Sequence, residues 1–506
     1  RYLSQFRGTS LYYTICFRAK IENMKMRTRL APSPTGEIHV GSIRTLLYDY
    51  ALAKQSEGEL VLRIEDTDQS RYVEGSVERM LKVIKDYGLK WDEGPEVGGP
   101  YQPYFQSQRL DIYKKYALEL VEKGNAYYCF CDEDRLNKVR EGQKEMGGVT
   151  KYDRFCLNLS KEDVEENLKK GKPYVIRMKV PSDVDIEVED MVLGKLTFPS
   201  NDLDDQVLIK SDGFPTYHLA VVVDDHLMKI THVLRGREWL PSTPKHVLLY
   251  EFFGWEKPKF IHLPLLRETD STKKLSKRTG SVSALGFLEE GYLPEALLNF
   301  MMFLGWNPGT EREVYSLNDF VKDFSIEKIQ KSEMAAFDRQ KLLWFNGLYI
   351  RNLPLEDLWN RVVKWHEEYS EKLNLKNSTD ARNLKILEIV RERMKKLSEF
   401  NDITFYFFEE PKIDKKTAEK FSGDSKKAHE IIDNFIEVYK NIPSEKWNVP
   451  DLDAISHEKL AEFSYKPKEA FMTIRYITTG CESTPPLFDV LGLLGKEETL
   501  KRLKKF

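Results

Sequence analysis

The segment Arg29-Leu-Ala-Pro-Ser-Pro-Thr-Gly-Glu-Ile-His-Val-Gly-Ser42 decides how the first part of this chain folds. A short apolar stretch reaches Leu30 and Ala31, and the Pro-Ser-Pro-Thr-Gly run then breaks it. From Ser42 to Lys54 the apolar residues recur at helical spacing. The segment therefore predicts a strand, a turn, and a helix that the residues after His39 open.

The chain on either side of this segment extends the same pattern. Leu60–Ile64 predicts a second strand and a helix is expected from about Tyr72 to Tyr87, which gives a β-α-β-α opening typical of a parallel sheet. Three later apolar runs are predicted as strands: Gln206–Lys210, Tyr217–Asp224 and Ile230–Leu234. After about Ser325 the chain is predicted to be almost wholly helical.

Composition describes a large globular chain without identifying its chemistry. The chain has 506 residues, 41% of them hydrophobic and 31% charged, so several packed domains are expected. No run of about 18 apolar residues occurs, which excludes a predicted membrane span. Five cysteines do not make a disulfide framework, and a reducing compartment is expected. The net charge of −3 means that any RNA would have to bind local basic patches.

The first residues differ from the rest. Arg1–Lys25 contains five basic residues and a single acid, Glu22, and it does not begin with Met. One interpretation is a transit peptide, because such segments are basic and poor in acids. The preferred interpretation is upstream sequence that precedes a start at Met24 or Met26.

Two motifs could carry chemistry. In the first, His39-Val-Gly-Ser42 opens a helix, and a helix N-terminus offers N–H groups to a phosphate. Gly41 would let a flat base approach the backbone, and His39 could donate to phosphate oxygens. On its own the pattern fits a helix cap with a nearby histidine equally well.

The second motif is Lys273-Lys-Leu-Ser-Lys-Arg-Thr-Gly280. Four cations around a serine could wrap a polyphosphate, although a basic loop in solvent is the usual origin of such a run. The two motifs lie about 230 residues apart and in this order, and together they say much more than either alone.

The pair resembles the HIGH and KMSKS signatures of class I aminoacyl-tRNA synthetases. The flanking sequence resembles the bacterial-type glutamyl-tRNA synthetases, over about residues 26 to 505. The stretches that carry this resemblance are Arg63-Ile-Glu-Asp-Thr-Asp68, Phe214-Pro-Thr-Tyr-His-Leu-Ala220, Asp224-Asp-His-Leu-Met228 and Arg235-Gly-Arg-Glu-Trp-Leu-Pro-Ser-Thr-Pro-Lys-His246.

The resemblance implies an α/β Rossmann-type catalytic domain with an inserted α+β acceptor-stem domain, followed by an all-α anticodon-binding region. The implied divisions are an N-terminal extension (1–24), the two catalytic halves (25–102 and 206–266), the insertion (103–205), a stem-contact domain with the Lys-Leu-Ser-Lys-Arg loop (267–330) and the helical anticodon-binding region (331–506).

The resemblance also implies the site residues. Glutamate would be bound by Arg29, Ala31, Ser33, Glu65, Tyr217 and Arg235. ATP would be bound by His39, Gly41, Glu238, Leu266, Lys274, Leu275, Ser276, Lys277 and Arg278. Of these, His39, Gly41, Lys274 and Lys277 are the expected catalytic residues.

The chemistry of these residue types fits the implied substrates. A guanidinium binds a carboxylate bidentately, and the Glu65 carboxylate suits an ammonium group. Arg29 and Glu65 would each be costly to bury without a partner, so substrate is expected to complete them. The α-carboxylate of glutamate is already ionised when it attacks ATP, so positioning and charge stabilisation, helped by Mg²⁺, are expected to suffice.

Two departures from the family pattern matter. Val221 stands where the family usually has Asn, which puts one polar contact with glutamate in doubt. Cys129, Cys131 and Cys156 fit the zinc-ligand spacing of some relatives, but Asn158 stands in place of the fourth ligand. Because a structural zinc wants four ligands, zinc is not expected.

The expected partners are tRNA-Glu, with tRNA-Gln as an open possibility, and L-glutamate. A cytoplasmic monomer is expected, with a mitochondrial or plastid matrix as the alternative. A glutaminyl-tRNA synthetase is disfavoured because its anticodon domains are β-barrels, and a tRNA-modifying paralogue because it lacks an anticodon domain. A small-molecule nucleotidylyltransferase would not need the long helical tail, and the intact His39, Lys274 and Lys277 disfavour a non-catalytic RNA-binding relative.

Overall fold

The computed structural model describes residues 25–147, 150–275, 282–370, 373, 375 and 378–506, and these form two compact units. The first unit contains the chain up to Gly286 together with Leu298–Asp338, and the second contains Phe287–Leu297 and Arg339–Phe506. Residues 1–24, predicted as an N-terminal extension, lie outside the described residues. Within the described parts of the chain, no helix is long and apolar enough to cross a membrane.

The first unit holds all the strands of the described chain. These are β1 (Arg27–Leu30), β2 (Glu59–Leu62), β3 (Ala126–Cys129), β4 (Val175–Met178), β5 (Asp185–Asp190), β6 (Gly194–Pro199), β7 (Val207–Ile209), β8 (His232–Gly236), β9 (Lys259–Leu263), β10 (Leu265–Glu268) and β11 (Met334–Phe337). Its helices are α2 (Val40–Gln55), α3 (Ser76–Asp86), α4 (Leu110–Glu122), α5 (Glu133–Glu145), α6 (Lys161–Lys169), α7 (Tyr217–Leu227), α8 (Thr243–Phe253) and α11 (Leu317–Asp323). Residues of both units occur in α9 (Ala284–Glu289) and α10 (Pro294–Met302).

Parallel pairing organises the part of the first unit that holds the motifs. β1 pairs with β2 in parallel, and β8 pairs with β9 in parallel within a sheet of order β6-β5-β9-β8. β1 also lies beside β8, where the Thr231 N–H donates to the Arg27 carbonyl at 3.0 Å. The carboxyl ends of β1, β2 and β8 consequently come together, which is the edge where parallel sheets bind ligands.

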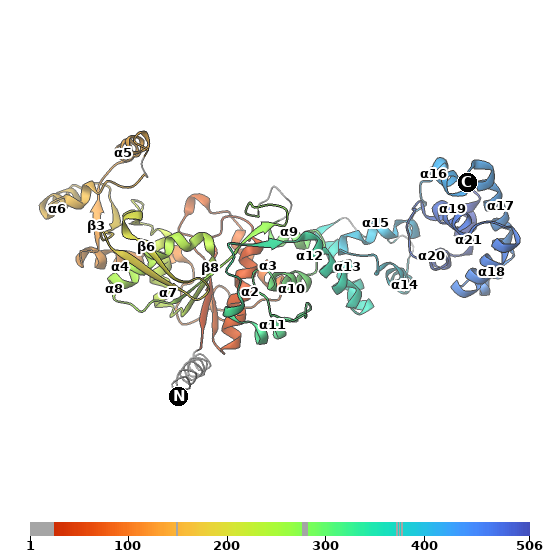
Figure 1. The fold of residues 1–506 in the computed structure, drawn as a ribbon, viewed down its shortest axis with the longest axis horizontal. Coiled ribbons are helices and arrows are strands. Elements are labelled where there is room, and N and C mark those ends of the chain that lie inside the picture. Colours follow the sequence, from red (N-terminus) through yellow and green to blue (C-terminus); the bar gives the residue numbers. More distant parts are fainter. Residues whose placement is uncertain (1–24, 148–149, 276–281, 371–372, 374, 376–377) are drawn as a thin grey trace, which may run out of the picture. The chain divides into compact units, whose positions relative to one another are not determined.

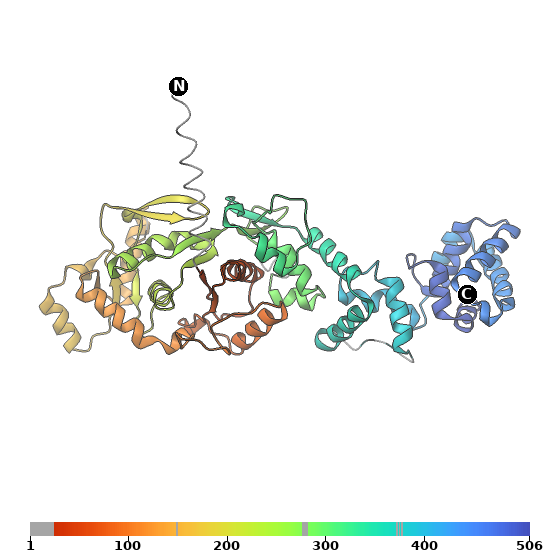
Figure 2. The ribbon, with the colours of Figure 1, turned by 90° about the horizontal axis from the view of Figure 1, so that it is seen from below.

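Helix α2 connects β1 to β2, as the sequence predicts. Its apolar residues at helical spacing, such as Val40, Ile43 and Leu47, are fully buried against the sheet. The His39 side chain caps the N-terminus of the helix, and Figure 2 shows the helix nearly end-on, in dark red. The first turn of α2 is therefore fixed relative to the end of β1.

The hairpin β5–β6 belongs to the same sheet as β8 and β9. β5 pairs antiparallel with β6 along its whole length and meets β9 in parallel at Asp190. These residues lie in the segment predicted as an insertion. The same segment contains β3, α5 and α6, which lie together at one end of the first unit (Figure 1). Asp190 is thus brought next to β9, which in turn pairs with β8, the strand that carries Arg235.

Two sequence predictions of secondary structure are wrong. Tyr217–Asp224 was predicted as a strand but lies in helix α7, whose residues from Leu219 to Asp225 are buried. Because α7 is buried on all sides, its apolar residues do not recur at helical spacing. A short apolar run with three valines is therefore mistaken for a strand. Met334–Phe337, in the range predicted to be helical, forms β11 because it pairs in parallel with β10.

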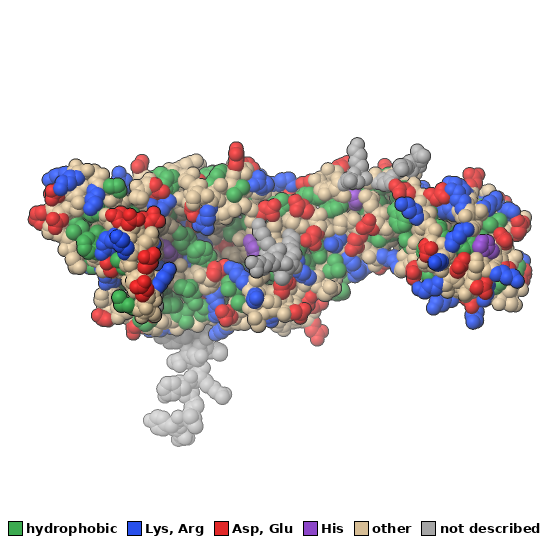
Figure 3. All heavy atoms as spheres, turned by 90° about the horizontal axis from the view of Figure 1, so that it is seen from above, with side chains coloured by type: hydrophobic (Ala, Val, Ile, Leu, Met, Phe, Trp, Pro, Cys, Tyr) green, Lys and Arg blue, Asp and Glu red, His purple; other side chains and the backbone are tan. Residues whose placement is uncertain are grey.

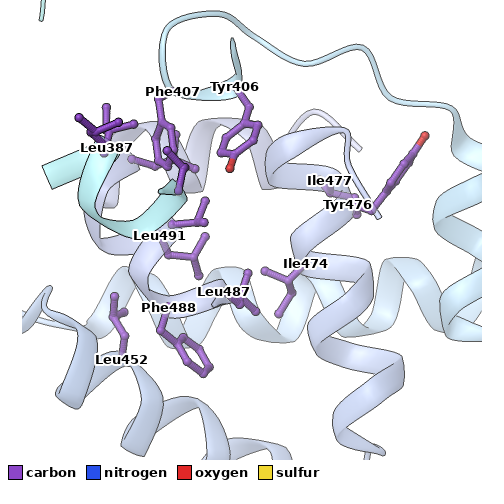
Figure 4. Packing of buried hydrophobic residues seen from close by; sticks show 14 of the residues in the cluster. Leu387, Tyr406, Phe407, Leu452, Ile474, Tyr476, Ile477, Leu487, Phe488 and Leu491 are labelled. Atoms are coloured by element: carbon purple, nitrogen blue, oxygen red, sulfur yellow. The ribbon is translucent and has the colours of Figure 1, made fainter. Parts of the chain in front are cut away.

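The second unit is helical in its described residues. Beside the parts of α9 and α10 that fall in it, its helices are α12 (Arg339–Asn352), α13 (Leu355–Tyr369), α14 (Asp380–Val390), α15 (Phe400–Thr404), α16 (Lys415–Ser422), α17 (Ser425–Asn441), α18 (Val449–Glu462), α19 (Pro467–Thr479), α20 (Leu487–Leu494) and α21 (Lys496–Leu503). Figure 4 shows Ile474, Leu487 and Leu491 converging in its apolar core. In Figure 3 acidic and basic side chains are interspersed over the end of the chain that contains α16–α21.

Candidate active site

A pocket of about 760 Å³ opens at the carboxyl ends of β1, β2 and β8, beside the N-terminus of α2. Twelve of the predicted site residues line it: Arg29, Ala31, Ser33, His39, Gly41, Glu65, Tyr217, Arg235, Glu238, Leu266, Lys274 and Leu275. The other three, Ser276, Lys277 and Arg278, lie outside the described residues. The two motifs, distant in sequence, therefore border one cavity.

The pocket also has lining residues that the sequence did not single out. Lys210, Arg71 and Trp239 belong to this group. Lys210 directly follows β7, and the ring of Trp239 packs on Tyr217 with centroids 4.6 Å apart. Of these three, only Lys210 could have been predicted from the local sequence, because it is a basic residue directly after a strand.

The first turn of α2 presents backbone and imidazole donors to the pocket. The Gly41 N–H donates to His39 Nδ1 at 2.9 Å. A neutral imidazole that accepts at Nδ1 carries its proton on Nε2, which makes Nε2 a donor. A Cβ on Gly41 would lie 3.0 Å from His39 Nδ1 and 3.8 Å from Leu266, so a larger residue would force the imidazole to shift by a few tenths of an ångström.

The second motif reaches the pocket through Lys274. Its Nζ lies 3.1 Å from Glu238 Oε1, and both side chains are partly exposed. Next to it, the Leu275 N–H donates to the Leu266 carbonyl at 2.7 Å, which ties the loop to β10. A partly exposed ion pair is weak, so Lys274 can leave Glu238 for a more highly charged partner such as a phosphate.

A buried network of charges forms the floor of the pocket. Arg29 Nε lies 3.3 Å from both carboxylate oxygens of Asp225, and its Nη1 donates to the Leu234 carbonyl. Arg63 contacts Asp225 at 2.8 Å and Glu65 at 3.2 Å. The prediction that Arg29 and Glu65 lack a counter-charge before substrate binds is therefore wrong, because Asp225 on α7 supplies one to Arg29 and Arg63 supplies one to Glu65.

Glu65 has an unusual environment. Its carboxylate is almost fully buried, and burial raises the pKa of Glu65 to about 7 despite the opposing effect of Arg63 and Arg29. A carboxylate that is costly to keep ionised gains strongly from a cation in contact with it. Glu65 is consequently suited to bind an ammonium group.

Arg235 provides the opposite charge. Its guanidinium donates to His262 Nε2, Tyr217 Oη, His246 Nδ1 and Thr243 Oγ1, at distances of 2.8–3.2 Å. Within the described chain it contacts no carboxylate. Because Tyr217 accepts from Arg235, its hydroxyl proton is available for a second partner. The two side chains together can donate to a carboxylate in the pocket.

Val221, the residue that departs from the family pattern, lies in α7 and is 2% exposed. It packs in the apolar core with Leu219 and Val223. Its side chain adds apolar contacts to the first unit, and the pocket-lining residues identified above do not include it.

Three cysteines form a separate cluster near β3. The Sγ atoms of Cys129, Cys131 and Cys156 all lie within 4.8 Å of one another. The Tyr152 hydroxyl lies 3.3 Å from both Cys129 Sγ and Cys131 Sγ. Ligands around a tetrahedral zinc with bonds of about 2.3 Å are separated by about 3.8 Å, so these four atoms have the right spacing.

Comparison with known proteins agrees with this arrangement. A family model described as the catalytic domain of class I tRNA synthetases (E and Q) matches residues 25–344. The glutamate–tRNA ligase of Clostridium tetani is 44% identical over 95% of this chain and 97% of its own length, and that of Clostridioides difficile is 43% identical over 95% and 98%.

The chain belongs to the glutamate–tRNA ligase family. A second model, for an anticodon binding domain, matches residues 357–506, which comprise most of α13 and all of α14 to α21. Among solved structures, a glutamate–tRNA ligase from Elizabethkingia meningosepticum in complex with its amino acid has a TM-score of 0.85 at 36% identity, covering 95% of this chain and 99% of that one. A glutamate–tRNA synthetase from Elizabethkingia anophelis gives the same TM-score at 37% identity and the same coverage.

Family membership fits the charges of the pocket. A ligase that joins glutamate to tRNA has to bind an amino acid with one ammonium and two carboxylate groups. The pocket of this enzyme offers Glu65 for the ammonium, with Arg235 and Tyr217 as donors for a carboxylate.

Proposed function

We propose that this pocket performs both steps of glutamate–tRNA ligation, forming glutamyl-adenylate from L-glutamate and ATP and then transferring glutamate to the terminal adenosine of tRNA-Glu. Family membership makes the enzyme an ATP-dependent glutamate–tRNA ligase. The single observation that supports the location is that Glu65, Arg235, His39 and Lys274 line one cavity.

Glutamate lies between Glu65 and Arg235 in this proposal, and ATP lies at the first turn of α2. His39 Nε2 and the N-terminus of the helix donate to phosphate oxygens, and Lys274 exchanges Glu238 for phosphate. Lys277 stabilises the charge that develops on the leaving pyrophosphate. Lys277 is proposed from its sequence motif alone.

The chemistry needs no general base. The α-carboxylate of glutamate is ionised at neutral pH and attacks the α-phosphorus of ATP, and pyrophosphate leaves. In the second step a ribose hydroxyl of the terminal adenosine attacks the carbonyl carbon of the adenylate, and AMP leaves. Positioning within the cavity supplies most of the acceleration.

Mg²⁺ is also proposed. When bound it would neutralise charge on the phosphates during transfer. The phosphates and water supply most of its ligands, so no dedicated cage of carboxylates is required. Glu238, which Lys274 releases in this proposal, lines the cavity and would be available to hold such an ion.

Aminoacylation of purified tRNA-Glu and tRNA-Gln with labelled glutamate tests the function. We expect the enzyme to charge tRNA-Glu, and we propose that it acts as a monomer in the cytoplasm. Charging of both tRNAs would show a non-discriminating enzyme. Arg235→Gln should raise the KM for glutamate, whereas the matched control Arg312→Gln, at a partly exposed ion pair with Asp319, should not. Failure to charge either tRNA contradicts the proposal.

The affinity for glutamate should depend on pH through Glu65. Its carboxylate binds the ammonium, and it is ionised above its pKa of about 7. As the pH falls below 7 the carboxylate becomes protonated, so kcat/KM for glutamate should fall about tenfold for each pH unit, and above pH 8 it should be constant. Steady-state kinetics at saturating ATP measure this.

A matched variant isolates the responsible group. Glu65→Gln carries no titrating proton at this position, so its kcat/KM for glutamate, although low, should lose the dependence near pH 7. A wild-type profile that is flat between about pH 6 and pH 8 would contradict the role of Glu65.

We also propose that Cys129, Cys131, Cys156 and the Tyr152 hydroxyl hold a structural Zn²⁺. Zinc was not expected from the sequence because Asn158 replaces the fourth ligand. The position of the Tyr152 hydroxyl supports the proposal, because it supplies a fourth oxygen donor within 3.3 Å of two sulfurs. The ion would join β3 to the segment around Cys156 and would take no part in the reaction.

Elemental analysis should find about one zinc per chain. Cys131→Ser should lose most of the metal and lower the melting temperature, because structural zinc contributes directly to folding. Cys481→Ser, at a free cysteine of the second unit, serves as the control and should keep the metal. Wild-type protein that is purified without zinc, and whose melting temperature does not rise when zinc is added, would refute a structural metal site.

A further inference from the structure

Arg235 differs from the other buried arginines at the pocket floor in the kind of partner that it has. Arg29 and Arg63 each contact a carboxylate directly, whereas the described partners of Arg235 are two imidazoles and two hydroxyls. Four of its five N–H groups donate to these neutral acceptors. Its positive charge is therefore held in place without a carboxylate in direct contact.

This arrangement requires a particular tautomer of His262. A guanidinium can only donate, so His262 Nε2, 3.1 Å from Arg235 Nε, must be the acceptor. The proton of the neutral ring is then on Nδ1, which lies 2.7 Å from Asp190 Oδ2. Burial lowers the pKa of His262, so the ring is neutral at physiological pH.

Asp190 is held firmly enough to select that tautomer. Its side chain is fully buried, and its Oδ1 accepts from the N–H groups of Val192 and Leu193 at 2.9 and 2.8 Å. Its Oδ2 accepts from the His262 N–H as well as from the ring. Four donors fix the carboxylate, so it can serve only as an acceptor toward Nδ1.

The geometry points to Asp190 and His262 as positioning residues for glutamate binding: Asp190 fixes the tautomer of His262, and His262 thereby orients Arg235 with its charge available to a substrate carboxylate. This inference rests on the proposed function, in which Arg235 binds glutamate. A carboxylate in direct contact with Arg235 would compete with the substrate. Asp190 instead acts through the ring, and it comes from the β5–β6 hairpin rather than from the strands that line the pocket.

The decisive variant is Asp190→Asn. The amide oxygen should stay on the two N–H groups that Asp190 Oδ1 accepts, so the NH2 group faces His262 and donates to Nδ1. The ring proton then moves to Nε2, where it faces the Arg235 N–H, and two donors oppose each other. The NH2 group also opposes the His262 backbone N–H, so the melting temperature is measured alongside the kinetics. The KM for glutamate should rise about tenfold, because a lost hydrogen bond to a charged group is worth about 1.5 kcal/mol. The KM for ATP and kcat should change less than twofold, because only substrate binding is affected.

A second variant separates this role from a structural one. In His262→Gln the amide oxygen can accept from Arg235 whether residue 190 is a hydrogen-bond donor or an acceptor. Adding Asp190→Asn to His262→Gln should therefore change the KM for glutamate less than twofold. Two-bond ¹H–¹⁵N spectra of the histidine rings should show the Nδ1–H tautomer of His262 in wild type and its loss in Asp190→Asn. Asp205→Asn removes another buried carboxylate, whose described partners do not include Arg235 or His262, and should leave the KM unchanged.

The outcomes distinguish this inference from the proposed function. If Arg235→Gln leaves the KM for glutamate unchanged, the proposed role of Arg235 fails and the inference fails with it. If Arg235→Gln raises it but Asp190→Asn does not, the inference alone is overturned. The inference would also be overturned if Asp190→Asn raised the KM for glutamate equally in the wild-type and His262→Gln backgrounds. A rise in the KM for ATP as large as the rise in the KM for glutamate would overturn it too.

Discussion

Glu65→Gln is expected to lower kcat/KM for glutamate about a hundredfold or more. The substrate ammonium would lose the buried carboxylate that opposes it, and breaking a buried ion pair from one side costs about 3 kcal/mol or more. Glutamine has nearly the same shape, so the loss reports charge rather than packing. Kinetics with glutamate varied at saturating ATP measure it.

The same variant should fold normally. Arg63 keeps Asp225 at 2.8 Å and Asp224 at 3.6 Å, so it retains two counter-charges after Glu65 becomes neutral. The melting temperature should change by less than about 5 °C. Glu59→Gln, at the start of β2 and at a side chain that is 51% exposed, is the matched control and should keep wild-type kinetics. Wild-type affinity in Glu65→Gln would show that the ammonium binds elsewhere.

Gly41→Ala is expected to reduce the rate of glutamyl-adenylate formation about tenfold. The added methyl group would lie 3.0 Å from His39 Nδ1 and would move the imidazole away from the first turn of α2. Because misplacing a reacting group by about 1 Å can cost about a hundredfold, a shift of a few tenths of an ångström is expected to cost about tenfold. Pyrophosphate exchange in the presence of tRNA measures the step.

The control for this variant is Gly142→Ala on α5. A Cβ there meets no atom within 4 Å, and its backbone has no positive φ, so the substitution should leave exchange unchanged. The KM for glutamate should also stay near the wild-type value in Gly41→Ala, because the methyl group faces His39 and Leu266 rather than Arg235. If Gly41→Ala left the pyrophosphate exchange rate unaltered, His39 would serve only to cap α2 and would not bind phosphate.

The sequence predicted the contents of the pocket better than the contacts within it. His39 and Lys274 were associated through motifs whose order and spacing resemble one family, and the structure places both at one cavity. The helix at Tyr217–Leu227 was missed because a buried run with three valines lacks a helical period. The partner of Arg29 was missed with it, since Asp225 lies on that helix.

Contacts between distant residues leave no local pattern. Asp190 and His262 are 72 positions apart, and neither is unusual among its neighbours in sequence. Tyr152 is a similar case, because a single tyrosine before Cys156 suggests nothing until the three sulfurs are placed around its hydroxyl. Parallel strand pairing and loop closure create such sites, and these are properties of the folded chain.

The neutral surroundings of Arg235 also bear on how the amino-acid preference of this enzyme could be altered by engineering. Replacing Arg29 would leave Asp225 with Arg63 as its counter-charge, and replacing Arg63 would remove the cation beside Glu65, so either exchange would disturb a buried network of charges. Arg235 can be exchanged for a neutral side chain without leaving such a charge behind, because its imidazole and hydroxyl neighbours can turn or bind water. Directed evolution toward an uncharged amino acid should therefore change position 235 more readily than position 29 or 63.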